Sequence, residues 1–205
     1  MKTFLFQGDS ITDWYRSRTD DRALGCGYAN LTAAKIEFAH PGEFQFVNRG
    51  VGGDRSTNLY ARCNFEMAGC KPDYMSVLIG VNDVWHALSD NVAVQPNRYE
   101  QIMSMLIEDA KEAFPELKIF ILEPFVLKAC STEKAWEAFD TNVRALAQIA
   151  RKLAEKYGLV FVPLQDKFDE LAAQTAPENW AFDGVHPTAA GHELIARELL
   201  KATGL

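Results

Sequence analysis

Short apolar runs along this chain alternate with longer stretches in which apolar residues recur every three or four positions. The runs are rich in Val, Ile, Leu and Phe, which is typical of strands buried on both faces. The 205 residues therefore contain five candidate strands. They cover Thr3–Phe6, Phe44–Asn48, Tyr74–Ile79, Lys118–Leu122 and Leu159–Val162.

Amphipathic helices are predicted between these runs. The clearest has apolar residues at spacings of three and four from Trp136 to Tyr157, which places them on one helix face. The pairs Phe114-Pro115 and Tyr157-Gly158 supply stop signals. The helical patterns cover Tyr28–Phe38, Thr57–Met67, Arg98–Phe114, Thr132–Tyr157 and Ala189–Ala202.

This alternation predicts a single α/β domain over residues 1–205, with a doubly wound, five-stranded parallel sheet and helices on both faces. Ligands bind outside the carboxyl ends of the strands in such a sheet. Three polar and glycine-rich segments follow the first three strands, and a fourth lies near the C-terminus. They are Gly8-Asp9-Ser10-Ile11-Thr12, Asn48-Arg49-Gly50-Val51-Gly52-Gly53-Asp54, Gly80-Val81-Asn82-Asp83 and Asp183-Gly184-Val185-His186-Pro187.

These segments supply the groups that ester hydrolysis through a serine requires. Ser10 lies at a strand-to-helix turn and is the candidate nucleophile, although a simple N-cap is its alternative. His186 is the candidate base, because it alone among four histidines has a carboxylate nearby in a constrained loop. Asp183, three residues earlier, can accept from Nδ1–H and leave Nε2 facing Ser10.

Donors for an oxyanion come from three of the segments. We expect the backbone N–H groups of Ser10 and Gly53, together with the side-chain amide of Asn82, to form an oxyanion hole. The alternative for the glycine segment is a flexible turn or a weak phosphate loop, but it lacks a Walker lysine. Asp54 and Asp83 are expected to cap helices or brace loops.

Charge and composition narrow the function classes. The net charge is −7 and the pI is about 5.1, with no basic stretch, so no nucleic-acid partner is expected. The first apolar run is too short for a signal peptide, and no run could span a bilayer. We therefore expect a cytoplasmic protein with no membrane partner. The four cysteines show no metal-ligand spacing, and we expect free thiols, no metal and no cofactor.

In their order and spacing the four segments resemble the sequence blocks of the SGNH, or GDSL, hydrolases, from residue 4 to about residue 200. The resemblance implies a three-layer α/β/α, flavodoxin-like fold, no metal, and hydrolysis through an acyl-enzyme. It assigns the family's serine, glycine, asparagine, aspartate and histidine to Ser10, Gly53, Asn82, Asp183 and His186. The Gly-x-Ser-x-Gly elbow of ordinary α/β-hydrolases is absent.

A narrower resemblance concerns bacterial carbohydrate esterases of this family, among them intracellular acetylxylan esterases that deacetylate xylo-oligosaccharides. It rests on Gly8–Trp14, Leu24–Tyr28 and Ile79–Trp85. It implies a small acetylated carbohydrate as substrate and a homo-oligomeric enzyme.

Three tryptophans within four positions of a motif fit a sugar substrate, because indole faces suit sugar rings. Trp14, Trp85 and Trp180 are therefore candidate substrate-binding residues, with packing in the core or at a subunit contact as the alternative. His86, four residues after Asn82, is a further candidate for substrate contact.

The sequence thus predicts a serine esterase that removes acetyl groups from carbohydrates. One alternative is a thioesterase or lysophospholipase of the same fold. Another is a catalytically vestigial ligand-binding protein. A nucleotide- or flavin-binding domain is suggested by the fold alone.

Overall fold

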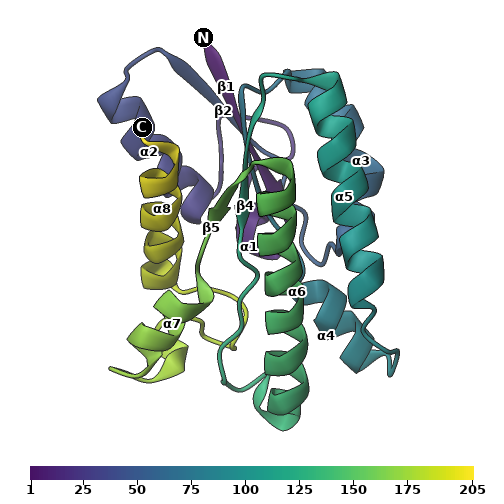
Figure 1. Cartoon of the computed structure of the whole chain (residues 1–205). Helices are drawn as coiled ribbons and strands as arrows, with labels where there is room; N and C mark the ends of the chain where they lie inside the picture. Colours follow the sequence, from purple (N-terminus) through teal and green to yellow (C-terminus); the bar gives the residue numbers. More distant parts are fainter.

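A three-layer α/β/α arrangement is evident in the computed structural model, which describes residues 1–205 (Figure 1). Its central sheet has five parallel strands in the order β2-β1-β3-β4-β5. This is the flavodoxin-like strand order, and it confirms the predicted fold class. The strands are β1 (Lys2–Gly8), β2 (Phe44–Asn48), β3 (Tyr74–Leu78), β4 (Lys118–Leu122) and β5 (Val160–Val162).

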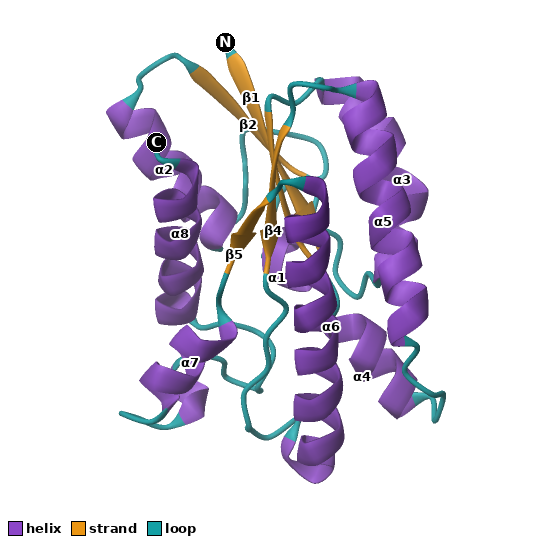
Figure 2. Ribbon diagram, in the orientation of Figure 1, coloured by secondary structure: helices purple, strands orange, loops and turns teal.

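Helices cover both faces of the sheet (Figure 2). On one face α2 (Tyr28–Ala39) packs against α8 (Ala189–Thr203). On the other face α5 (Pro96–Ala113) packs between α3 (Ser56–Cys70) and α6 (Trp136–Tyr157). The shorter elements are α1 (Ser10–Asp13), α4 (Val81–Ser89), α7 (Gln165–Ala172) and the 3₁₀ turns η1 (Glu133–Ala135) and η2 (Pro177–Asn179).

Each predicted strand and helix is present, with ends shifted by a few residues, but two helices were not predicted. These are α4 and α7, which have only nine and eight residues. The helix expected from Thr132 starts at Trp136, because the Thr132 side chain is engaged in the preceding loop. Its hydroxyl donates to the Leu127 carbonyl at 2.6 Å and accepts from the Ala129 N–H at 3.0 Å.

Stacked aromatic rings link the three central strands. Phe4 lies 4.7 Å from Phe6, 5.7 Å from Tyr74 and 6.2 Å from Phe120, measured between ring centroids. Phe4, Phe6 and Phe120 are almost fully buried. Because β-strand side chains alternate between faces, Phe4 and Phe6 point to the same side of the sheet. The rings therefore contribute both buried area and specific packing to the core.

The carboxyl ends of β1, β2 and β3 bring the first three polar segments to one edge of the sheet. Asn48 fixes two of them together, since its side-chain amide donates to the carbonyls of Thr12 and Leu24 at 2.7 and 2.9 Å. Its oxygen accepts from the Gly50 N–H at 2.9 Å. None of the helices has both the length and the apolar character that crossing a bilayer requires. All four cysteines are free.

Replacing Asn48 by Ala is expected to lower the free energy of unfolding on the order of 3 kcal/mol, because three buried backbone groups lose their partner. Urea denaturation measures the change. Gln45→Ala on the same strand is the control: Gln45 is exposed and donates to a single hydroxyl, so its loss should cost about 0.5 kcal/mol or less. Equal losses for the two variants would contradict this account of Asn48.

Candidate active site

Ser10 is the first residue of α1. The turn before it leaves no room for a side chain at Gly8. The Asp9 carboxylate caps the helix by accepting from the Ile11 N–H at 3.0 Å. A Cβ on Gly8 would lie 2.3 Å from Thr12 Oγ1 and 2.4 Å from the Leu78 carbonyl oxygen. This tight approach at Gly8 fixes where Ser10 leaves the strand.

A continuous chain of hydrogen bonds joins the serine, histidine and aspartate predicted from the sequence. Ser10 Oγ lies 2.9 Å from His186 Nε2, and His186 Nδ1 lies 2.7 Å from Asp183 Oδ2. The second oxygen of Asp183 accepts from the N–H groups of Val185 and His186 at 2.9 and 2.7 Å. The short loop therefore fixes the carboxylate and the imidazole relative to each other.

The pKa values of this pair move in opposite directions. Partial burial alone would raise the pKa of Asp183, but hydrogen bonds from the His186 ring and from the His186 and Val185 backbone hold it below its usual value. The hydrogen bond to Asp183 raises the pKa of His186 above 6.5, against the effect of burial. Both shifts favour an ionised carboxylate that stabilises a protonated imidazole.

The three groups predicted as oxyanion donors come from the segments that follow β1, β2 and β3. The Ser10 N–H is at the first position of α1, where it has no partner within the helix. Gly53 has a φ of +82°, while a Cβ there would meet nothing within 4 Å. Glycine is thus required at this position by backbone conformation, and crowding by the protein is not the reason. Asn82 donates one amide hydrogen to the Asp54 carbonyl at 3.1 Å, which leaves its second hydrogen free.

Asp54 and Asp83 hold the loops that carry these donors. The Asp83 carboxylate accepts from the N–H and the hydroxyl of Ser56 at 2.9 and 2.5 Å. Asp54 forms an ion pair with Arg62 at 2.7 Å. Both contacts agree with the structural roles predicted for these aspartates.

Two buried titratable groups lie behind the serine and the imidazole. Burial raises the pKa of Asp9 to about 7, although the Ile11 N–H and the neighbouring His186 oppose the shift. Burial lowers the pKa of His192 to about 4. His192, in α8, is buried and accepts from the Tyr28 N–H at the start of α2 at 3.1 Å. No group of three or more His, Cys, Asp or Glu side chains is placed to hold a metal ion.

A cavity of about 490 Å³ opens over Ser10 and His186. Trp14 forms part of its wall, with its ring 6.1 Å from that of His186. Phe182 is 48% exposed and its ring lies 5.8 Å from His186 on a nearly parallel plane. The other lining residues are Asp13, Tyr15, Arg16 and Arg18.

The other predicted substrate-binding residues do not line the cavity over Ser10. Trp85 packs edge-on against Phe139 and lies 6.2 Å from the His186 ring. His86 lines a different cavity, which does not include Ser10 or His186. Trp180 does not line the cavity over Ser10, because its indole N–H is turned toward Leu171 and Thr175. Phe182 takes the place expected of Trp180.

Sequence reasoning missed Tyr15 and Phe182, although each directly adjoins a residue that it named. Tyr15 follows Trp14, and Phe182 precedes Asp183. Both are exposed aromatic residues beside the cavity over Ser10. Their position next to a motif was the available signal, but among Trp, Tyr and Phe only tryptophan was considered.

Comparison with known proteins agrees with this geometry. Residues 6–194 match the GDSL-like lipase/acylhydrolase family. An acetylxylan esterase from Geobacillus stearothermophilus is 32% identical over 210 residues, which cover 98% of this chain and 93% of that enzyme.

Solved structures lead to the same family. A Parabacteroides merdae protein that has been assigned as a GDSL-like lipase superposes with a TM-score of 0.93 at 33% identity, over 99% of this chain and 95% of its own. An acetylxylan esterase structure from Geobacillus stearothermophilus superposes with a TM-score of 0.87 at 28% identity, over 100% of this chain and 94% of its own. That enzyme also matches as catalytic mutants with alanine at an aspartate, a histidine or a serine. The present chain therefore belongs to the GDSL-like lipase/acylhydrolase family and is a carboxylic ester hydrolase.

Proposed function

We propose that this hydrolase removes acetyl groups from small carbohydrates, xylo-oligosaccharides in particular, through an acyl-enzyme on Ser10. The observation that carries the proposal is the hydrogen-bond chain from Ser10 to His186 to Asp183. The same three residue types are replaced in the catalytic mutants of the related acetylxylan esterase.

In the first step, Ser10 Oγ forms a bond to the acetyl carbonyl carbon while its proton passes to His186 Nε2. The carbonyl electron pair moves onto oxygen, where the N–H groups of Ser10 and Gly53 and the Asn82 amide stabilise the negative charge. Asp183 keeps the imidazole in the required tautomer and favours its protonated form. The tetrahedral intermediate collapses as His186 donates the proton to the departing sugar oxygen.

In the second step, water takes the place of Ser10 as the nucleophile and hydrolyses the acyl-enzyme. His186 accepts a proton from a water molecule as that molecule attacks the acyl carbon. The same donors stabilise the second oxyanion, and the proton then returns to Ser10 Oγ as acetate leaves. No group outside this site is needed to balance either step.

The walls of the cavity over Ser10 support a short acyl group and a sugar alcohol. Trp14 and Phe182 present aromatic surfaces, while Arg16 and Arg18 place cations along the same cavity. A long alkyl chain would have to cover those charges, which is costly. A related enzyme from Geobacillus stearothermophilus, 28% identical to this chain, is an acetyl-xylooligosaccharide esterase. A thioesterase or lysophospholipase of the same fold remains the alternative.

Replacing Ser10 by Ala is expected to abolish hydrolysis of p-nitrophenyl acetate and leave the melting temperature close to that of the wild type. Without the hydroxyl there is no nucleophile to form the acyl-enzyme. A fluorophosphonate probe should label the wild-type protein at Ser10 by mass spectrometry. Ser104→Ala on α5 is the control and should keep full activity. Appreciable turnover by Ser10→Ala would contradict the mechanism.

The pH profile should report the His186–Asp183 pair. His186 acts as a base only when neutral, so kcat/KM should fall as the pH drops through its pKa, with a midpoint above 6.5. Asp183→Asn removes the main cause of the raised pKa. It should move the midpoint to lower pH and reduce kcat by roughly 10²–10⁴-fold.

Asp9 must be separated from this effect, because the pKa of Asp9 is about 7 and its charge also raises the pKa of His186. Asp9→Asn should move the midpoint less than Asp183→Asn does, since Asp9 forms no hydrogen bond with the imidazole. A midpoint that follows Asp9 alone would refute the assignment to His186.

Activity should decline steeply from acetyl to butyryl to octanoyl esters of one alcohol. Phe182→Ala should reduce kcat/KM for acetylated xylose several-fold more than for p-nitrophenyl acetate, because the sugar loses an aromatic face. Phe38→Ala, which removes a phenyl ring that is 92% exposed on α2, is the control. A preference for octanoyl esters would instead favour the thioesterase or lysophospholipase.

A further inference from the structure

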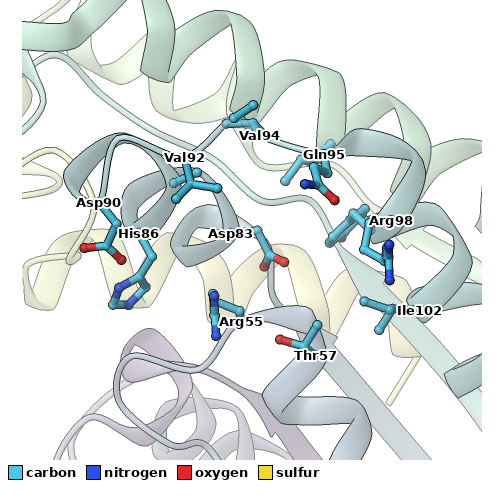
Figure 3. A pocket seen from close by; sticks show the side chains of 14 residues that line it. Arg55, Thr57, Asp83, His86, Asp90, Val92, Val94, Gln95, Arg98 and Ile102 are labelled. Carbon is cyan, nitrogen blue, oxygen red and sulfur yellow. The ribbon is translucent and has the colours of Figure 1, made fainter.

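A second cavity, of about 380 Å³, is lined by Arg55, Asp83 and Arg98 among others (Figure 3). It is bounded by the start of α3, by α4, and by the start of α5 with the loop before it. Its volume falls within the range of roughly 300–1,000 Å³ that is usual for small-molecule sites. Nothing in the mechanism above uses it.

The chain connects this cavity directly to two oxyanion donors. Arg55 comes two residues after Gly53, and Asp83 follows Asn82. His86 lies one helical turn beyond Asn82 on α4, so both face the same side of that helix. The bonds from Ser56 to Asp83 hold the start of α3 against α4. The segments that carry two of the oxyanion donors therefore continue directly into the lining of this cavity.

Two guanidinium groups in the cavity have no carboxylate partner. The Arg98 guanidinium forms no hydrogen bond or ion pair within the protein, and the Arg55 guanidinium donates only to Asn58. By contrast, six of the other eight arginines pair with Asp or Glu. Figure 3 shows Arg55 and Arg98 on opposite sides of Asp83.

Acceptors balance these donors. The Asp83 carboxylate and the Asp90 carboxylate also line the cavity, so its formal charge is close to neutral when His86 is uncharged. Val92, Val94 and Ile102 supply apolar surface between the polar groups. An alkyl chain placed here would cover charged groups without replacing their hydrogen bonds to water, and an anion would meet two aspartates. A neutral ligand with many hydroxyl groups, each both donor and acceptor, fits this lining.

We propose that the cavity binds a second sugar unit of an oligosaccharide whose acetylated unit lies at Ser10. This proposal rests on the proposed function. It makes Arg55 and Arg98 the residues through which the enzyme prefers longer oligosaccharides to single sugars. The forked guanidinium groups donate to hydroxyl oxygens of the second unit, and the aspartates accept from its hydroxyl hydrogens.

Binding is measured first, by calorimetry of the wild-type protein with xylose and xylotriose, which carry no acetyl group and are not consumed. Xylotriose should bind about tenfold more tightly than xylose. Arg98→Ala and Arg55→Ala should each remove most of that difference, since hydrogen bonds to charged groups are lost. Arg98→Lys, which keeps the charge without the fork, should have an intermediate effect. Arg151→Ala is the matched control, because Arg151 also lacks a carboxylate partner and stacks on Phe161 elsewhere.

Turnover is measured second, as the ratio of kcat/KM for acetylated xylotriose to that for acetylated xylose. The ratio should be about ten for the wild type and for Arg151→Ala, and close to one for Arg98→Ala. Melting curves establish that each variant is folded.

Three results would overturn the proposal. They are equal binding of xylose and xylotriose, a difference that survives in Arg98→Ala and Arg55→Ala, and tighter binding of glucuronate or sulfate than of xylotriose. The last would identify an anion site. If the wild type cleaves p-nitrophenyl acetate but no acetylated sugar, the proposed function fails, while the calorimetry still decides what the cavity binds.

Discussion

The active site depends on a backbone contact that excludes side chains. Gly50, in the loop after β2, lies so close to α1 that a Cβ would be 2.2 Å from the Asp13 nitrogen and 2.6 Å from the Thr12 carbonyl carbon. The Asn48 amide joins the same two segments from the side. This contact fixes the turn that carries Ser10 against the loop that carries Gly53. Nucleophile and oxyanion donor therefore have one relative position, set by the sheet and by two loops packed backbone to backbone.

The loop that carries Asp183 and His186 is also held by close backbone packing, against a different part of the chain. The loop after β4 holds the loop of Asp183 and His186 through hydrogen bonds from the Leu127 N–H to Gly184 and from the Ser131 N–H to Asp183, at 2.8 and 3.1 Å. A Cβ on Gly184 would lie 2.5 Å from both the Leu127 carbonyl and the Thr132 hydroxyl oxygen. Preorganisation of this kind keeps the imidazole in position without relying on the substrate.

The features that the sequence predicts are those whose signal lies within a short segment of the chain. Strands such as Lys118–Leu122 were predicted because a run of apolar residues reports burial directly. Ser10, Asp183 and His186 were placed together because parallel strands end at one edge and the loop spacing is short. The side chain that lies elsewhere than expected is Trp180, whose indole N–H donates to the Leu171 carbonyl at the end of α7. No periodicity in the chain records that contact.

Asp183 and His186 are delivered by one loop of four residues, whereas Ser10, Gly53 and Asn82 each come from a different strand end. The carboxylate receives three hydrogen bonds, all from residues 185 and 186, so the loop itself sets the geometry within the pair. In evolution the pair can keep that internal geometry while the segment between β5 and residue 180 changes in length. The three strand ends have no such freedom, because an insertion in any of them alters the shared edge. Divergence within the fold should therefore accumulate before the histidine loop and spare the edge that holds the oxyanion.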